Sequence, residues 1–485
     1  MNNNNKILMI ILCVFVLLAG VSAHAGETLD TRIGKLSFTH DFANGYPTIE
    51  TQQLLFNEID FQRACQAYLC AIPLVSMAQW QYAHTEQLGA ENGQIVFAES
   101  YEDKLGGLTY NTTTPYVLPF IDLTEGPWVM VMPEGEVRGA ANDFWQIGVA
   151  QMTKPGKYLF VGPDQEVPKQ AVQEGFTVIQ MPTLNILPGV RLMSKDRDER
   201  MAILEKIEIY PYAERAHPRP RGYITPAGKP WQAWHPRGME YWVRLADIIN
   251  REPIHERDRF MMAMLKPLGI EKGKPFKPDE RQTKILTEAA LVGEAMAKAN
   301  DFFNPRLEDS HYVEGSNWEY ATTSTPEQRR ETYDDLDERA AWFYEAVTND
   351  PMMHGQKTGK GQVYMAAYRD ADGDWLDGAV NYTLHVPPNA PVKAFWSLTI
   401  YDVATRAIIV NETKRVDRSS RMDLLTNADG SVDLYIGPDK RKGDKAKNWI
   451  QTVPGKAWFP YFRLYSPKQA FLDKTWILPD IEKAK

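Results

Sequence analysis

Cysteine is scarce in this sequence of 485 residues, which contains only Cys13, Cys65 and Cys70. Cys65 and Cys70 lie five residues apart in FQRACQAYLC. On a regular helix such residues point in different directions with Cα atoms roughly 8 Å apart, beyond disulfide reach. We therefore expect two small buried side chains, and a disulfide only if the helix is broken there. Pro73 is expected to open the first turn of a second helix.

The motifs of the common enzyme classes are also missing. The sequence has no G-x-S-x-G elbow, no H-E-x-x-H, no phosphate-binding G-x-x-x-x-G-K-[ST] loop and no G-x-G-x-x-G finger. Its nine histidines are scattered singly, with no pair at the spacing of zinc ligands. We therefore predict no metal and no cofactor. A site assembled from residues distant in sequence stays open.

An excess of positive charge is missing as well. The formal net charge is −9, with Lys and Arg dispersed along the chain, which argues against nucleic acid as a partner. No basic amphipathic helix offers a footing on a membrane surface. The expected partner is a small molecule, a glycan or another copy of this chain.

The N-terminal residues have the three parts of a secretory signal. A polar start with Lys6 precedes the apolar run ILMIILCVFVLLAGV, and the small-residue triplet Ala23-His24-Ala25 follows. We expect cleavage near Gly26, a periplasmic or secreted protein, and no membrane span after signal removal. Loss of Lys6 changes the formal charge from −9 to −10. The alternative is a retained anchor, for which the apolar run is short.

The apolar pattern divides the rest of the chain into helical and β regions. Helical periodicity is clear between Thr51 and His84, whereas short apolar runs such as WVMVM, KYLFVG and AFWSLTIYD indicate strands. We predict an α+β, mainly β fold with two β-sandwich or jelly-roll domains and no βαβ rhythm. The predicted segments are a signal peptide (1–25), an N-terminal helical region (26–104), a first β-sandwich domain (105–240), a helical linker region (241–355) and a second β-sandwich domain (356–485).

A hydroxyl-rich loop at the entrance of a predicted strand is the first candidate site. The stretch NTTTPYVLPF places Tyr110, Asn111 and Tyr116 together, and the cluster NDFW with Trp145 follows. Tyrosine and tryptophan offer a flat apolar face with a polar tip, which suits stacking against a sugar or an aromatic ligand. Packing in a core is the alternative for any one of the thirteen tryptophans.

Two further candidates lie near the C-terminus. Arg463 stands between Phe462 and Leu464 on a predicted strand, so it points opposite to both. In a cleft its guanidinium could clamp a carboxylate or phosphate, but pairing with Asp402 is an equal alternative. Trp396 in AFWSLTIYD is a candidate for ligand binding.

An acidic cluster in RDADGDWLDG is the candidate for calcium. Carboxylates at alternating positions can surround a hard cation. The EF-hand pattern fails, however, because Trp375 stands at the glycine position and Asn381 at the bidentate glutamate position. A solvated turn is therefore the preferred interpretation. The acidic residues concerned are Asp370, Asp372, Asp374 and Asp377.

These segments together resemble a family of bacterial exported proteins that combine two domains of unknown function, numbered 1254 (N-terminal) and 1214 (C-terminal). The resemblance rests on stretches such as NTTTPYVLPFIDLTEGPWVMVMP, GKYLFVGP, KIEIYPYAE, LGIEKGKPFKPDERQTKIL, PVKAFWSLTIYD, NWIQTVPGKAWF and FRLYSP. It implies two β domains with helical material between them, export, and no agreed reaction or cofactor. Many relatives have an Asp where this chain has Thr113. Asp143 is then the nearest candidate for an acid or base.

Three functions are compatible with these features. The first is an enzyme of the hydrolase or lyase type acting on a small molecule or glycan, with Asp143 and Tyr116 catalytic and a pocket near the first β domain. The second is a non-catalytic protein that binds a carbohydrate or small ligand. The third is a structural envelope protein that forms a homo-oligomer.

Overall fold

The computed structural model describes residues 26–303, 310–354 and 358–484. The predicted signal peptide (1–25) therefore lies outside the described residues. Within these ranges no helix is both long and apolar enough to cross a membrane. The chain divides into two compact units, Met1–Asp60 and Phe61–Lys485, here called the N-terminal unit and the main unit.

The described part of the N-terminal unit contains a β-hairpin. Strands β1 (Thr28–Thr31) and β2 (Gly34–Ser37) are antiparallel, and helix α1 (Ile49–Tyr82) begins after them. This hairpin was not predicted from the sequence, because strands of four residues are too short to show a clear period of two.

Helix α1 continues through Pro73, so the prediction of a second helix starting there is wrong. Proline removes one backbone donor and crowds the preceding turn. Side chains from distant segments donate to carbonyl groups of Pro73 and of the turn before it: Tyr241 to Tyr68 O (2.7 Å), Arg339 to Cys70 O (3.3 Å) and Gln146 to Pro73 O (2.8 Å). Tertiary hydrogen bonds therefore support the helix where its own ladder is interrupted. Cys65 and Cys70 form no disulfide, as expected for an unbroken helix; Cys65 is buried as predicted, but Cys70 is only partly buried.

Two sheets form the first β region, which we define as strands β3 to β13. The seven-stranded sheet has the order β13-β3-β4-β11-β7-β8 with β5 beside β11, and the four-stranded sheet has the order β10-β9-β6-β12. Phe97 and Val190 of the larger sheet share a buried core with Met130 and Phe160 of the smaller one. The strands are β3 (Ile95–Ala98), β4 (Tyr116–Pro119), β5 (Ile121–Asp122), β6 (Trp128–Met132), β7 (Val137–Asn142), β8 (Gly148–Gln151), β9 (Gly156–Val161), β10 (Phe176–Gln180), β11 (Asn185–Leu192), β12 (Glu208–Pro211) and β13 (Tyr223–Ile224).

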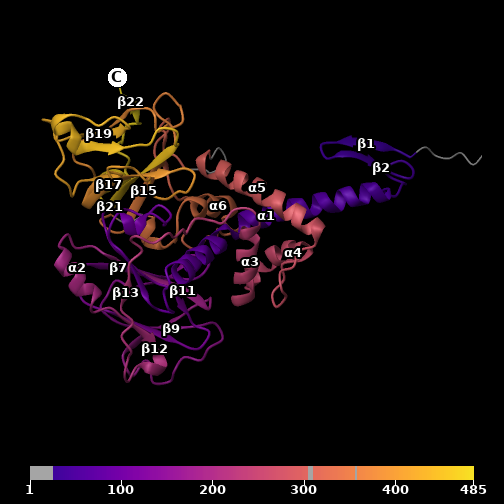
Figure 1. Ribbon diagram of the computed structural model, residues 1–485, viewed down its shortest axis with the longest axis horizontal. Helices are drawn as coiled ribbons and strands as arrows, with labels where there is room; N and C mark the ends of the chain where they lie inside the picture. The colour runs from indigo at the N-terminus through magenta and orange to yellow at the C-terminus, as the bar shows by residue number, and fades with distance from the viewer. Residues whose placement is uncertain (1–25, 304–309, 355–357, 485) are drawn as a thin grey trace, which may run out of the picture. The chain divides into compact units, whose positions relative to one another are not determined.

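Two more sheets form the second β region, strands β14 to β22, which Figure 1 shows in orange and yellow. Their orders are β14-β15-β21-β17-β18 and β20-β19-β16-β22. Leu398, Phe462 and Leu434 belong to their shared core. The strands are β14 (Trp318–Tyr320), β15 (Gln362–Ala367), β16 (Tyr382–Val386), β17 (Val392–Asp402), β18 (Asp417–Ser419), β19 (Val432–Gly437), β20 (Trp449–Gln451), β21 (Trp458–Pro467) and β22 (Glu482–Lys483).

Helices lie between the two β regions in sequence, as predicted. The longest of them, α5, starts with a capping box in which Asp279 and Gln282 satisfy each other's backbone N–H groups. The helices after α1 are α2 (Arg197–Leu204), α3 (Met239–Arg251), α4 (Arg259–Leu265), α5 (Glu280–Phe302), α6 (Leu336–Glu345) and α7 (Gln469–Leu472).

The predicted fold class is confirmed: the protein has several sheets, an N-terminal helix and helices between two β regions, and the sheets form no closed barrel in the described part of the chain. Two strands also lie outside the predicted β domains. Strand β3 lies in the region predicted to be helical, and β14 lies in the predicted helical linker and joins the second β region. Three strand pairs, β9 with β10, β3 with β13 and β19 with β20, are parallel.

Candidate binding site

A cavity of about 140 Å³ lies between the two β regions of the main unit. Its lining includes Arg138, Arg191 and Arg463, so we call it the arginine cavity. One wall is the face of the seven-stranded sheet that is turned away from the sandwich core. The opposite wall is a face of the five-stranded sheet, and the end of α6 closes one side.

Strand register aligns two arginines on the first wall. Arg138 on β7 is directly opposite Arg191 on β11, and Arg191 is directly opposite Tyr116 on β4. Directly opposed residues share a face of the sheet, so all three side chains point to the cavity, which they line. Gly189, two residues before Arg191, leaves space on the same face, because an added Cβ would meet only side-chain atoms of Leu118 and Leu187 at 3.6 and 3.9 Å.

Strand register also places Arg463 on the second wall. On β21 it is directly opposite Tyr364 of β15 and Ser397 of β17. Tyr461 lies two residues earlier on the same face and lines the cavity with Tyr364. Every residue of β21 is buried, because one of its faces packs in the sandwich core and the other turns to the cavity.

All three cavity arginines donate hydrogen bonds to uncharged groups. Arg191 donates to Thr114 Oγ1 from Nε (3.0 Å) and Nη2 (2.7 Å), and also to the Tyr465 hydroxyl (3.1 Å). Arg463 donates to the Tyr401 hydroxyl (2.6 Å) and to Thr109 O (2.6 Å).

Arg138 follows the same pattern, with bonds to Gly361 O (3.2 Å), Gln362 Oε1 (3.2 Å) and Ser466 Oγ (3.1 Å). Among the residues that the structure describes, none of the three cavity arginines forms an ion pair. The three guanidinium groups therefore have no salt-bridge partner among these residues, although the buried carboxyl groups of Asp350 and Asp417 interact electrostatically with Arg191 and Arg463.

The charge of Arg138 is unfavourable in this environment, whereas neighbouring tyrosines outweigh the effect of burial on Arg191 and Arg463 and raise the pKa of both. Like charges directly opposite each other on neighbouring strands repel. Burial lowers the pKa of Arg138, and the nearby charge of Arg191 lowers it further. Asp350 is the one acidic residue among the described residues that line the cavity. Its carboxylate accepts hydrogen bonds from Met352 N (2.8 Å) and Gln151 Nε2 (3.2 Å), and burial raises its pKa.

Hydrogen bonds within the loop from Asn111 to Tyr116 fix its conformation. Asn111 Oδ1 accepts the backbone N–H groups of Thr113 (2.9 Å) and Thr114 (2.8 Å), and Asn111 Nδ2 donates to the Tyr116 hydroxyl (2.6 Å). Buried Lys104 donates to Thr114 O (3.1 Å), and burial and the charge of Arg191 lower its pKa to about 7. The loop therefore fixes Tyr116 and presents Thr114 to Arg191.

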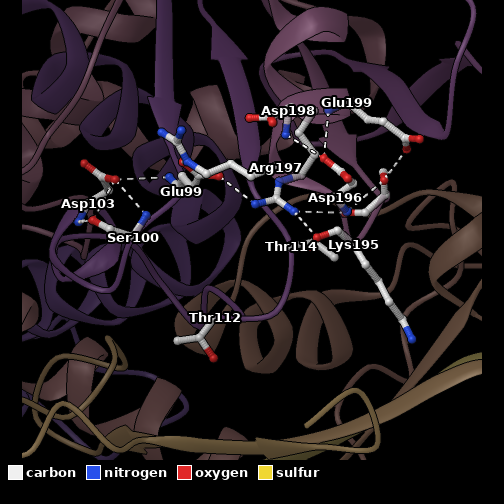
Figure 2. Close-up of polar contacts among 12 residues, drawn as sticks. Glu99, Ser100, Asp103, Thr112, Thr114, Lys195, Asp196, Arg197, Asp198 and Glu199 are labelled. Carbon is white, nitrogen blue, oxygen red and sulfur yellow. Dashed lines mark hydrogen bonds and ion pairs between the residues drawn. The ribbon is translucent and has the colours of Figure 1, made fainter.

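A second set of contacts fixes the chain beside this loop, as Figure 2 shows. Asp103 Oδ2 accepts the N–H groups of Glu99 (3.1 Å) and Ser100 (2.8 Å). The Glu99 carboxylate pairs with Arg197 (3.2 Å) and Arg200 (2.8 Å) of α2. This acid is therefore paired with α2 and not with the cavity arginines.

The cavity brings together three of the residues singled out in the sequence. Tyr110, Tyr116 and Arg463 line it, and the rings of the two tyrosines are stacked with centroids 4.6 Å apart. Asn111 is not among the described residues that line the cavity, but it donates a hydrogen bond to the Tyr116 hydroxyl. The alternative pairing of Arg463 with Asp402 is not found, since Asp402 pairs with Lys456.

The other three predicted site residues do not belong to the lining formed by the described residues. Asp143 lies in a turn where its Oδ1 accepts Ile147 N–H (2.9 Å), and burial raises its pKa to about 7. The Trp145 ring lies under the guanidinium groups of Arg257 (5.7 Å) and Arg339 (5.6 Å).

Trp396 lies in the core of the second β region, where its ring stacks on Phe462 with centroids 5.5 Å apart. In the strand AFWSLTIYD, alternation puts Trp396 on one face with Leu398 and Ile400. That face packs in the sandwich core, and Ser397 lies on the opposite face, directly across from Arg463 of β21.

Arg138 and Arg191 were not predicted from the sequence. Both occur in short strands, VRGAAN and NILPGVRL, at positions where an alternating pattern would put a charged residue on the face opposite the core. An arginine on that face is normally solvated, so the signal appears only when the second β region is known to cover it.

The acidic cluster of the second β region is neutralised by a lysine. Lys483 Nζ lies 3.2 Å from Asp370, 3.0 Å from Asp372 and 2.6 Å from Asp374. Asp370 Oδ1 also accepts the backbone N–H groups of Asp372 and Asp374, both at 3.0 Å. An ammonium group thus stands where a calcium ion would. Over the described ranges, no group of three His, Cys, Asp or Glu residues could hold a metal ion.

Comparisons with known proteins agree with this architecture. Residues 95–211 match the family model "Protein of unknown function (DUF1254)", and residues 361–469 match "Protein of unknown function (DUF1214)". None of the curated proteins matches the chain significantly.

Two solved structures are similar to this chain. The VPA0106 protein from Vibrio parahaemolyticus has 17% identity and a TM-score of 0.55, over 88% of this chain and 100% of that chain. An uncharacterized protein from Burkholderia cenocepacia has 12% identity and a TM-score of 0.38, over 90% of this chain and 97% of that chain. The first likeness extends to the fold alone.

Proposed function

We propose that this chain, which joins a DUF1254 domain to a DUF1214 domain, binds a small organic anion in the arginine cavity between these domains. Arg138 and Arg191 come from the first domain and Arg463 from the second. The predicted signal peptide supports a periplasmic or secreted location, so we further propose that the ligand is taken from outside the cytoplasm.

The observation that carries the proposal is that three arginines line one cavity and, among the described residues, none of them forms a salt bridge. Burying a charge costs several kcal/mol unless a partner or hydrogen bonds compensate for it. Here the hydrogen bonds go to neutral oxygens, and Arg138 and Arg191 repel each other across neighbouring strands. An anion between them removes this repulsion and accepts charge-assisted hydrogen bonds.

The lining supports an organic ligand over an inorganic ion. Trp80, Leu118 and Met353 line the cavity beside the stacked pair of Tyr110 and Tyr116. Ligand pockets are typically apolar with a few polar groups that fix orientation. A carboxylate or phosphate on a small apolar or aromatic body fits this chemistry, and an acidic sugar is included in the same class.

Titration calorimetry tests the proposal with benzoate, phenylpyruvate, phenyl phosphate and glucuronate as probes. At least one should bind the wild-type protein, and affinity should fall as salt rises. Arg191→Gln should weaken binding about 10- to 100-fold, the range for a lost hydrogen bond to a charged group.

The matched control is Arg197→Gln, which removes an arginine that is paired with Glu99 and largely exposed. Its affinity should equal that of the wild type. If no probe binds, or if both variants bind with equal affinity, the arginine cavity is not an anion site.

The structural role and the hydrolase or lyase activity considered from the sequence stay predictions. A homo-oligomeric role has no support from the cavity. A hydrolase or lyase needs an acid or base at the ligand, and Asp143 lies away from the lining formed by the described residues.

A further inference from the structure

Glu345 is a buried carboxyl group beside the arginine cavity. It is the last residue of α6 and has no exposed surface. Both of its carboxylate oxygens accept a hydrogen bond from the Tyr368 hydroxyl (3.2 Å each), and Oε2 also accepts one from the Tyr461 hydroxyl.

The position of Glu345 is unfavourable for a structural acid. The C-terminal end of a helix carries partial negative charge, which disfavours a carboxylate there. Within the described ranges Glu345 forms no ion pair, and burial raises its pKa to about 8. The titratable and charged groups that face it are Tyr368, Tyr461, Asp301 of α5, Glu319 of β14 and Arg406.

Tyr461 connects this carboxyl group to the cavity. It lines the cavity on the same face of β21 as Arg463, whose guanidinium carbon lies 4.9 Å from the centre of its ring. The residue after Glu345, Ala346, also belongs to the lining. An acid and a phenol in hydrogen-bond contact, at the edge of a positively charged cavity, have the chemistry of a general base.

We propose that Tyr461 and Glu345 form a proton-transfer pair that removes a proton from a carbon next to the carbonyl group of the bound anion. This activity rests on the proposed binding function, and it makes the protein an enzyme of the lyase or isomerase type.

The step balances within the cavity. The ligand C–H proton moves to the Tyr461 oxygen while the phenol proton moves to the Glu345 carboxylate. The C–H electron pair forms the carbon–carbon double bond of an enolate, and its negative charge develops on the carbonyl oxygen. The cavity arginines stabilise that oxygen. In D₂O the proton held by the pair is replaced by a solvent deuteron, and delivery of that deuteron through Tyr461 to the enolate carbon completes exchange and restores the carbonyl group.

Phenylpyruvate is a suitable probe because it carries a carboxylate, an aromatic ring and an acidic methylene group. Proton NMR in D₂O should show its methylene hydrogens exchanging at least 10-fold faster with the protein than in buffer alone. The rate should rise as pH passes through about 8, because Glu345 acts in its carboxylate form.

Two variants test the pair. Glu345→Gln and Tyr461→Phe should each lower the exchange rate at least 10-fold while phenylpyruvate affinity, measured by calorimetry, stays within about 3-fold of wild type. Tyr368→Phe removes a hydrogen bond to the same carboxylate but no residue that lines the cavity. Its exchange rate should fall far less.

The outcomes separate the two proposals. Absence of phenylpyruvate binding, with none of the other probes bound, overturns the binding function itself. Binding without accelerated exchange overturns the proton-transfer pair and leaves the binding function standing. Exchange that survives Glu345→Gln, or that is lost equally in Tyr368→Phe and Tyr461→Phe, also overturns the pair.

Discussion

Replacing Glu345 by glutamine should make the protein more stable at alkaline pH. The ordinary pKa of this group is 4.5, and in the folded protein it is about 8 because burial disfavours the charged form. Between these values the unfolded state has lost the proton and the folded state keeps it. Stability therefore falls as pH rises from about 4.5 to about 8, and the contribution is complete only below the unfolded pKa.

The magnitude follows from the same two values. The difference, 8 − 4.5 = 3.5 pH units, at about 1.36 kcal/mol per unit corresponds to roughly 5 kcal/mol at most. Glutamine keeps the shape of the side chain and a hydrogen-bond acceptor for the Tyr461 hydroxyl. Its stability should therefore lack this part of the pH dependence.

Urea denaturation at a series of pH values from 5 to 9 measures this effect. The free energy of unfolding of Glu345→Gln, minus that of wild type, should increase with pH and level off above about 8. Subtraction cancels the titration of other buried acids, such as Asp143. If the two stability curves run parallel across this range, Glu345 has an ordinary pKa, and the reasoning about its environment is refuted.

Three further perturbations test the cavity and the acidic cluster. Gly189→Leu should be tolerated, because an added Cβ meets only side-chain atoms. The leucine should fill the space beside Arg191 and weaken probe binding more than 10-fold in calorimetry without changing the net charge; unchanged affinity would place the ligand elsewhere. Arg138→Gln should remove the repulsion from Arg191, so its melting temperature without ligand should not fall, and the rise in melting temperature on adding a bound probe should shrink. Calcium should leave the melting temperature of the wild-type protein unchanged, because Lys483 neutralises the acidic cluster; a clear rise would show that the ion displaces the lysine.

The fold was predictable from the sequence where the apolar pattern is long. The helical period before Pro73 and the alternation in AFWSLTIYD correspond to α1 and β17. Pro73 itself was misleading, because the groups that support the helix around it come from Gln146, Tyr241 and Arg339, which are distant in sequence. The sequence around Pro73 contains no pattern from which these long-range hydrogen bonds could be predicted.

The site was predictable only in part. Tyr110, Tyr116 and Arg463 were predicted because an aromatic loop and an arginine between apolar neighbours can be recognised in the sequence itself. Arg138 and Arg191 look like ordinary outward-facing residues until another domain covers their sheet. Glu345 looked like an unremarkable helical glutamate for the same reason, since its burial depends on Tyr368 and Tyr461 from the second β region.

A crystal structure of the protein with 4-bromobenzoate tests the central claim most directly, because anomalous scattering from bromine locates the ligand independently of the protein. We predict a carboxylate within hydrogen-bond distance of Arg191 and of Arg138 or Arg463, with the ring against Tyr110 and Tyr116. Bromine found only on the outer surface, with the arginine cavity filled by water or by a rearranged acidic side chain, would contradict the account.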